Sequence, residues 1–168
     1  RLKNMQGILL INLGSPDDTE LSSIKSYLKE FLMDEYVIDI PKLVRNVLVK
    51  GLIVPFRSKG TQEAYTSIWT DEGSPLILNS IKTAKKLQAR LGIPGECAMR
   101  YKNPSIELAL RTLSEKGCKK IKVIPLYPHY AMATSLTTEL EVKRVENELG
   151  FGLQLDFISS FYNDNGYI

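Results

Sequence analysis

The sequence predicts an α/β fold, with a four-stranded parallel sheet flanked by helices in a three-layer sandwich. Four short segments are predicted to be strands, and the first of them, residues 7–13, is a continuous apolar run without alternation, which is typical of a strand buried on both faces. Segments with helical spacing of apolar residues separate the strands, and strands joined through helices pair in parallel with right-handed crossovers. A length of 168 residues with 43% hydrophobic residues suits one domain, over residues 1–168, with its own core.

The strands are expected over residues 7–13, 96–101, 119–124 and 153–158. The first strand ends in Gly14-Ser15-Pro16, a turn sequence with one glycine where a dinucleotide-binding fingerprint needs three. The third runs into Tyr127-Pro128-His129-Tyr130, a rigid turn that carries the only histidine of the chain. Strand ends that deliver such groups onto loops are where α/β proteins place chemistry.

Apolar spacing, capping residues and breakers predict six helices. They are expected from Asp18 or Thr19 to Met33, from Pro41 to Val54, from Lys59 to Trp69, from Pro75 to Leu91, from Ser105 to Gly117, and from Thr134 or Ser135 to Gly150.

The helix that begins at Pro41 is apolar over much of its surface, and Lys42, Arg45, Lys50 and Arg57 are interleaved with it or follow it. Two interpretations stay open. It is a core helix with a basic, solvated side, or it is an apolar, basic-edged lip that meets a membrane surface or an apolar anionic ligand.

The loops at the carboxyl ends of parallel strands share one edge of the sheet. Here they combine aromatic rings, one arginine, one histidine and several hydroxyls, without a carboxylate pair, a Ser-His-Asp set or a glycine-rich phosphate cradle. Such a pocket suits a flat apolar ligand better than a nucleotide. Structural interpretations remain beside this one: Arg100 pairs with a carboxylate such as Asp156 or with a helix C-terminus, and the tyrosines are packing residues.

Composition excludes several classes of protein. A net charge of +3, with the basic residues scattered, gives no basis for nucleic-acid binding. Cys97 and Cys118 lie in or beside apolar runs and indicate reduced core thiols in a cytosolic protein. Without a CxxC or a Cys/His cluster, a structural zinc site is not expected.

Several segments together resemble the N-terminal half of ferrochelatases, the enzymes that insert ferrous iron into a porphyrin in haem synthesis. The matching segments are Leu9-Leu10-Ile11-Asn12-Leu13-Gly14-Ser15-Pro16, Tyr27-Leu28-Lys29-Glu30-Phe31-Leu32, Tyr65 through Ser74-Pro75-Leu76, Met99-Arg100-Tyr101-Lys102-Asn103-Pro104-Ser105 and Leu126-Tyr127-Pro128-His129-Tyr130. The resemblance runs over nearly the whole chain. It implies a chelatase-like, Rossmann-like domain that forms one wall of a porphyrin cleft, with the other wall in a second, C-terminal domain that this chain lacks.

The resemblance also implies roles for individual residues. The residues that match the family's porphyrin wall and its neighbouring lip and loop are Leu13, Tyr65, Ser74, Arg100, Tyr101, Tyr127 and Thr134. The family's principal catalytic histidine and glutamate lie in the second half, so His129 is implied as an auxiliary group on the approach path of the iron. Ala131 and Ala133 stand where the family often has serines, which leaves Thr134 and Ser135 as the hydroxyls there.

The resemblance further implies a porphyrin and the C-terminal domain as partners, ferrous iron as substrate and no permanently bound cofactor. The lip over residues 43–56 is implied to contact the porphyrin or a membrane, so the expected location is the cytoplasm, peripheral to the inner membrane. The isolated chain is expected to be inactive. Two alternatives remain: a tetrapyrrole chelatase for another metal, or a non-catalytic α/β domain that binds a small apolar or phosphorylated ligand.

Overall fold

The computed structural model describes residues 5–168, so the first four residues of the predicted domain lie outside it. The strands are β1 (Met5–Gly14), β2 (Gly95–Tyr101), β3 (Cys118–Pro125) and β4 (Gln154–Phe157). They form one sheet in the order β2-β1-β3-β4, and all neighbours are parallel. The predicted four-stranded parallel sheet is confirmed.

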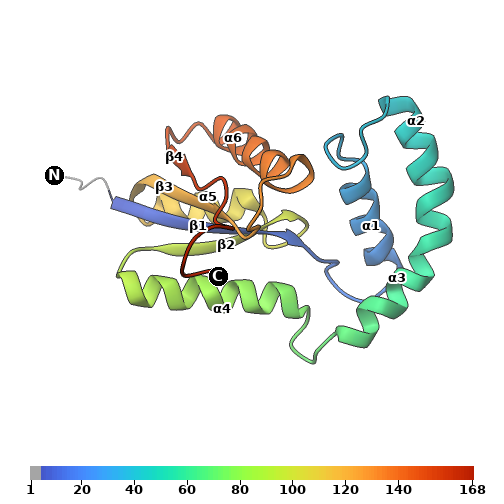
Figure 1. Cartoon of the computed structure of the whole chain (residues 1–168), viewed down its shortest axis with the longest axis horizontal. Coiled ribbons are helices and arrows are strands. Elements are labelled where there is room, and N and C mark those ends of the chain that lie inside the picture. Colours follow the sequence, from blue (N-terminus) through green and yellow to red (C-terminus); the bar gives the residue numbers. More distant parts are fainter. Residues whose placement is uncertain (1–4) are drawn as a thin grey trace.

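The helical elements fall into two groups (Figure 1). They are α1 (Leu21–Leu32), α2 (Lys42–Asn46), the π-helix η1 (Val47–Ile53), α3 (Val54–Ile68), α4 (Pro75–Leu91), α5 (Ile106–Glu115), the π-helix η2 (Met132–Leu136) and α6 (Thr137–Leu149). Helix α4 covers one face of the sheet, and α5 and α6 cover the other. Residues 21–68 stand beyond the carboxyl ends of the strands, and we call them the arm; the sheet with α4, α5 and α6 is the body.

Strand β1 explains why the core has two halves. Its side chains alternate between the two faces: Leu9 and Ile11 pack with α5 and α6, whereas Ile8 and Leu10 pack towards α4. All four are buried. A strand with helices on both faces buries every side chain, and this accounts for the unbroken apolar run in the sequence.

The arm corrects one prediction, because residues 42–68 form a continuous helical stretch instead of two helices. Pro55 has no amide hydrogen, and in a regular α-helix its ring clashes with a carbonyl one turn earlier. The wider π turn of η1 precedes it, and the Val54 N–H donates to Val49 O five residues back. The π turn changes the spacing at the proline and lets the helix continue through it.

Helix starts were predicted with mixed success. Ser105 caps α5 as expected, since its hydroxyl accepts a hydrogen bond from the Leu108 N–H at 3.2 Å. Helix α1 begins at Leu21, and Glu20 precedes it without a side-chain cap; Asp18 instead accepts a bond from the Glu20 N–H. The last helical segment begins at Met132, ahead of Thr134 and Ser135.

Candidate functional site

The ends of β1 and β2 meet at Gly14, which pairs with Tyr101 in the parallel register. Gly14 has φ +115°, and a Cβ there would lie 2.0 Å from the Tyr101 carbonyl oxygen. The Tyr27 hydroxyl lies 3.5 Å from the Gly14 carbonyl oxygen, to which it donates. Glycine is therefore required where the two strand ends meet the first helix of the arm.

Five aromatic rings then connect the end of β2 in the body to the end of α3 in the arm, and we call them the aromatic chain. In order they are Tyr101, Phe31, Tyr27, Tyr65 and Trp69. Neighbouring ring centroids lie 5.3, 6.1, 6.0 and 6.4 Å apart, and three of the four contacts are edge-to-face. Such contacts add to the stabilisation from burial itself, so the chain holds α1 and α3 against the end of β2.

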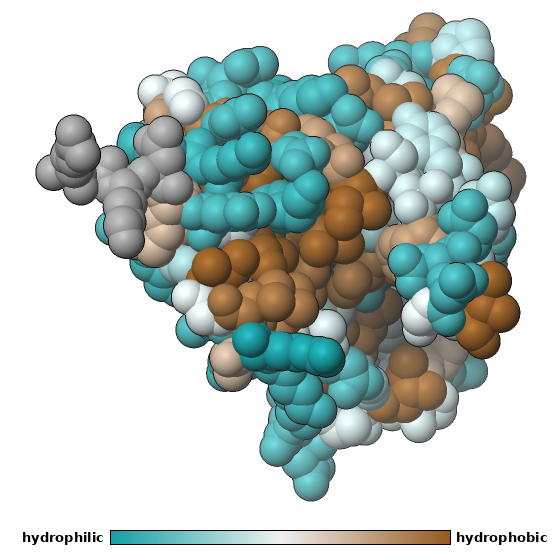
Figure 2. Space-filling view, turned by 60° about the vertical axis from the view of Figure 1, so that its left-hand side comes forward, coloured by the Kyte–Doolittle hydropathy of each residue, from teal (hydrophilic) through white to brown (hydrophobic). Residues whose placement is uncertain are grey.

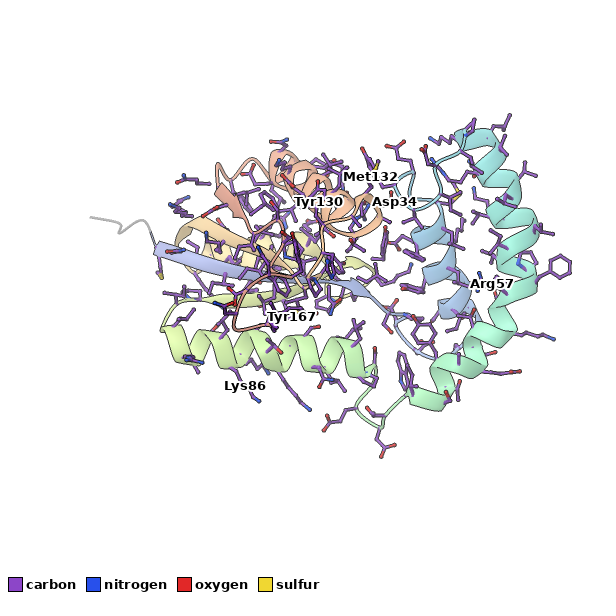
Figure 3. All side chains as sticks on the ribbon, viewed as in Figure 1. Asp34, Arg57, Lys86, Tyr130, Met132 and Tyr167 are labelled. Atoms are coloured by element: carbon purple, nitrogen blue, oxygen red, sulfur yellow. The ribbon has the colours of Figure 1, made fainter. Side chains whose placement is uncertain are left out.

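A carboxylate lies at the centre of the polar part of this junction. Asp34 Oδ2 accepts hydrogen bonds from Arg100 Nη2 at 2.7 Å, from Tyr101 Oη at 2.8 Å and from the Thr137 hydroxyl. Its other oxygen accepts the Tyr36 N–H at 2.8 Å. Arg100 Nε also donates to Thr137 Oγ1 at 2.9 Å. We call Asp34, Arg100, Tyr101 and Thr137 the Asp34 cluster; Figure 3 shows Asp34 between the arm and the body.

The hydrogen bonds control the charge of this cluster. Burial alone would raise the pKa of Asp34, but bonds from Thr137, Tyr101 and the Tyr36 N–H, together with the Arg100 charge, hold it below its usual range. Burial and the neighbouring carboxylate raise the pKa of Tyr101 despite the Arg100 charge. At neutral pH the cluster is therefore a carboxylate–guanidinium pair with a protonated phenol.

Three buried hydroxyls near the strand ends lack a hydrogen-bond partner of normal geometry among residues 5–168: those of Ser15, Tyr127 and Thr138. Ser15 follows β1, Tyr127 follows β3 and Thr138 lies in the first turn of α6. Burial raises the pKa of Tyr127 to about 12, so its phenol is protonated at neutral pH. A hydrogen bond from the neighbouring Thr138 side chain opposes part of this rise, so the two hydroxyls lie together at the carboxyl edge of the sheet.

The predicted site residues His129, Thr134 and Ser74 make their contacts outside the Asp34 cluster. His129 is exposed, and its ring stacks on Tyr162 with centroids 5.0 Å apart. The Thr134 hydroxyl lies in η2, 3.5 Å from the Ala131 carbonyl oxygen. Ser74 is buried as the residue before α4, without a side-chain capping bond. The structure thus brings Leu13, Tyr65, Arg100 and Tyr101 to one junction, through Gly14 and the aromatic chain.

The outer surface of the arm is apolar. Leu43 and Phe56 each have 78% of their surface exposed, and Val44, Val47 and Leu52 are exposed by more than half. Exposed basic residues border them, including Lys42, Lys50 and Arg57; Figure 3 shows Arg57 on α3. Arg45 differs, because it is buried and donates to the Ile38 and Ile40 carbonyl oxygens. We call residues 43–56 the apolar edge of the arm.

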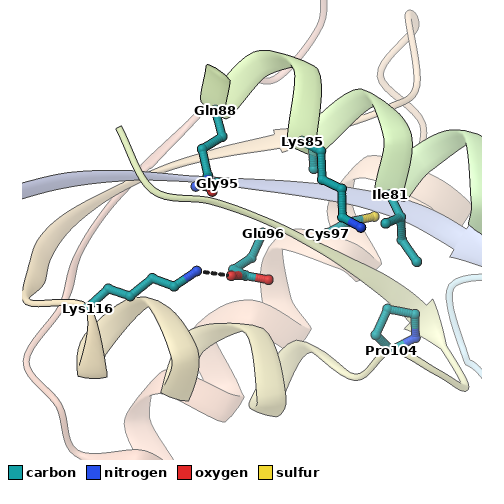
Figure 4. A pocket seen from close by; sticks show the side chains of 9 residues that line it. Ile81, Lys85, Gln88, Gly95, Glu96, Cys97, Pro104 and Lys116 are labelled. Atoms are coloured by element: carbon teal, nitrogen blue, oxygen red, sulfur yellow. Dashed lines mark hydrogen bonds and ion pairs between the residues drawn. The ribbon is translucent and has the colours of Figure 1, made fainter. Parts of the chain in front are cut away.

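Apolar side chains also gather on the face in Figure 2, in the middle, where the surface is hollowed. One cavity, of about 520 Å³, adjoins the Asp34 cluster and is lined by Lys42, Arg45, Glu141 and Arg144 among others. A second, of about 340 Å³, lies at the outer edge of β2 between α4 and α5, where Lys116 pairs with Glu96 at 2.5 Å (Figure 4). None of the predicted porphyrin-wall residues lines the second cavity.

Cys97 lines the second cavity, and burial raises the pKa of its thiol to about 12. Cys97 and Cys118 are buried and free, as predicted for core thiols. Within residues 5–168 no cluster of three or more His, Cys, Asp or Glu side chains is arranged to hold a metal ion. Over the same residues, each helix is too short or too polar to cross a membrane.

Sequence reasoning missed Asp34 as a site residue. Asp34 directly follows the predicted end of the first helix at Met33, and the carboxylate named as an example of a partner for Arg100 was Asp156. In the structure Asp156 pairs with Lys122 on the sheet, and Arg100 pairs with Asp34. One feature of the sequence could have indicated Asp34: it is a carboxylate directly after an amphipathic helix that had to pack near the strand ends.

Comparison with known proteins covers the same region. The family model described as Ferrochelatase matches residues 5–168. A ferrochelatase of Pseudomonas savastanoi is 45% identical over 163 residues, covering 96% of this chain and 47% of the relative. A ferrochelatase of Chromobacterium violaceum is 41% identical over 168 residues, covering 96% and 46%, and one of Stutzerimonas stutzeri is 42% identical over 165 residues, covering 97% and 48%.

The chain therefore spans about half the length of the curated relatives that it matches. The matched half is the N-terminal one, as the sequence segments indicated. A family match from residue 5 to residue 168, with relatives at 41–45% identity, confirms the resemblance drawn from those segments. The chain belongs to the ferrochelatase family.

Proposed function

We propose that the whole protein inserts ferrous iron into a porphyrin, proto- or coproporphyrin, and that this chain forms one wall of the porphyrin cleft. The single observation that carries the proposal is the family match over residues 5–168. The structure adds supporting chemistry, because aromatic rings and buried hydroxyls gather at the carboxyl edge of the sheet. Flat apolar ligands with a few polar groups bind in sites of this composition.

The proposed wall consists of the residues that the family resemblance indicated. They are Leu13, Tyr65, Ser74, Arg100, Tyr101, Tyr127 and Thr134, with His129 as an auxiliary group on the approach path of the iron. Their task is to pack one face of the macrocycle and to bend it. A bent ring turns a pyrrole nitrogen lone pair out of plane and brings the ground state closer to the geometry of insertion.

Insertion also requires removal of two pyrrole protons. A base on the opposite face of the ring takes them, and the C-terminal half of the protein supplies that base. Residues 1–168 alone are therefore a wall without a base, and they neither insert iron nor bind porphyrin tightly.

The test compares the full-length protein with residues 1–168 under anaerobic conditions. Loss of free-porphyrin fluorescence after addition of Fe²⁺ measures insertion, and the same assay with Zn²⁺ or Co²⁺ measures metal preference. The proposal expects insertion by the full-length protein and none by residues 1–168. Three results would contradict the proposal: iron insertion by residues 1–168, a full-length protein without chelatase activity, or a strong preference for another metal.

The apolar edge of the arm extends the proposal to location: the protein is cytoplasmic and contacts the inner membrane peripherally through residues 43–56. The support is the exposure of Leu43 and Phe56 beside basic residues, a combination that favours an anionic lipid surface.

The Leu43→Ser/Phe56→Ser variant is therefore expected to bind anionic vesicles about tenfold more weakly than the parent in a sedimentation assay. The matched control is Leu108→Ser, which changes a leucine that is 59% exposed on the body. An equal loss in both variants, or no loss in either, would argue against the membrane contact.

A further inference from the structure

We propose that Asp34 is a positioning residue that fixes the arm against the body and so sets the width of the porphyrin cleft. The inference rests on the proposed function, because the two surfaces that it holds together carry the proposed porphyrin wall. It assigns a role to a residue that the sequence motifs left outside the site.

Hydrogen bonds from different parts of the chain converge on Asp34. The bonds at Asp34 come from three segments that are distant in sequence: the end of β2 through Arg100 and Tyr101, the first residue of α6 through Thr137, and the arm's own backbone through Tyr36. The Asp34 side chain is 5% exposed, so water competes little for these bonds. A single carboxylate thus ties the arm to two elements of the body.

Two of the three guanidinium nitrogens of Arg100 already donate hydrogen bonds within the Asp34 cluster. One guanidinium nitrogen donates to Asp34, a second donates to Thr137, and its carbon lies 4.5 Å from the centre of the Tyr101 ring. The side chain is 15% exposed, and its charge is matched by Asp34. Arg100 therefore supports the porphyrin wall through its ion pair with Asp34. The anionic groups of the porphyrin then bind exposed cations such as Arg57.

Tyr101 connects the Asp34 cluster to the packing of the arm. Tyr101 is both a donor to Asp34 and the first ring of the aromatic chain, which ends at Trp69. A second charged link between arm and body, from Lys102 to Glu30 and Ser26, is more exposed and stabilises less. Loss of the Asp34 charge therefore shifts Tyr101, and with it the packing around Tyr65 and Trp69.

The test is a double-mutant cycle in the full-length protein, with Asp34→Asn, Arg100→Met and the combined variant. The control is Glu35→Gln, a neighbouring exposed carboxylate. Porphyrin affinity is measured by quenching of protein fluorescence, and kcat and KM for iron insertion are measured separately. Thermal unfolding shows which variants are folded at the assay temperature.

Each single variant leaves one buried charge unpaired and is expected to weaken porphyrin binding about tenfold, whereas the combined variant returns to within about threefold of the parent. Glu35→Gln stays unchanged. If Arg100 binds an anionic group of the porphyrin directly, the combined variant stays as weak as Arg100→Met, and that result overturns the proposal.

A second readout needs no porphyrin. Trp69 is the only tryptophan in residues 1–168, and its emission in that chain reports the packing at the end of the aromatic chain. We expect an emission shift in Asp34→Asn and recovery in the combined variant. Unchanged emission in a folded Asp34→Asn variant overturns the proposal even where porphyrin binding itself fails, so the two failures are distinguishable. If Asp34→Asn does not fold, Asp34→Glu takes its place, because it keeps the charge and changes only the reach.

Discussion

At the scale of single residues, Gly14 shows how closely two strand ends approach. A side chain there would meet the Tyr101 carbonyl at 2.0 Å, while Gly73, which has the same φ of +115°, has no heavy atom within 4 Å of the position that a Cβ would take. The two glycines share the same positive φ and differ in the contact that a Cβ would make. Together they form a matched pair in which the cost of the close approach can be separated from the cost of the backbone angle.

Gly14→Ala is expected to destabilise the chain by roughly 3 kcal/mol or more, and Gly73→Ala by about 1 kcal/mol, because only Gly14→Ala adds a clash with backbone to the strain. Urea unfolding followed by circular dichroism measures both. Equal losses in the two variants would mean that Tyr101 moves aside freely.

At the scale of elements, helix starts illustrate what local sequence specifies. Ser105 precedes α5, and its hydroxyl caps the helix, whereas Ser74 precedes α4 without a capping bond. The difference was not evident in the sequence, since both serines stand directly before a helix. The capping serine was predicted correctly because Ile106, Ala109, Leu110 and Leu113 follow at helical spacing.

Ser105→Ala is expected to lower the free energy of unfolding by about 1 kcal/mol through loss of the cap. Ser105→Asp keeps an acceptor at the helix start and should restore most of the loss. Chemical unfolding measures the stability of both variants. If Ser105→Asp is as unstable as Ser105→Ala, the loss of stability has a cause other than the missing cap.

The arm shows where local sequence fails. The sequence predicted one helix from Pro41 to Val54 and another from Lys59 to Trp69, with Pro55 between them, where the structure has one continuous stretch. A π turn is specified by packing over several residues, so no single residue announces it. The same limit applied to Asp34, whose partners Arg100, Tyr101 and Thr137 lie 66, 67 and 103 positions away. Strand runs such as residues 7–13 were predictable because burial on both faces leaves a local pattern.

At the scale of the whole molecule, the arm and the body are linked through an ionised carboxylate, which makes their association depend on pH. The pKa of Asp34 is lower in the folded chain than in the unfolded chain, so its stabilisation is present above the ordinary aspartate pKa of about 4 and is lost as the pH falls further. The charged side chains that line the adjoining cavity are Glu35, Lys42, Arg45, Glu141 and Arg144. A hydrogen bond from Arg144 likewise holds the pKa of Glu141 down, so both carboxylates act in the same direction.

The titration of Asp34 is expected to fall between roughly pH 6 and pH 3. Over this range the free energy of unfolding should decrease more in the parent than in Asp34→Asn, so the stability difference between the two proteins should narrow towards acid pH. Thermal unfolding across the range measures it, and Glu141→Gln separates the second carboxylate. A constant difference would show that Asp34 stabilises the fold independently of its charge.

The strand order has a consequence for how the protein is made. Strand β1 is synthesised first, yet it lies inside the sheet, where Leu10 pairs with Cys97 on one side and with Ile124 on the other. Its most apolar segment therefore leaves the ribosome long before either neighbour exists. Until then it is an unpaired, aggregation-prone strand in a nascent chain, and the arm and α4 must be completed before it is sheltered. The position that makes β1 the most protected strand of the finished domain makes it the most vulnerable one during translation.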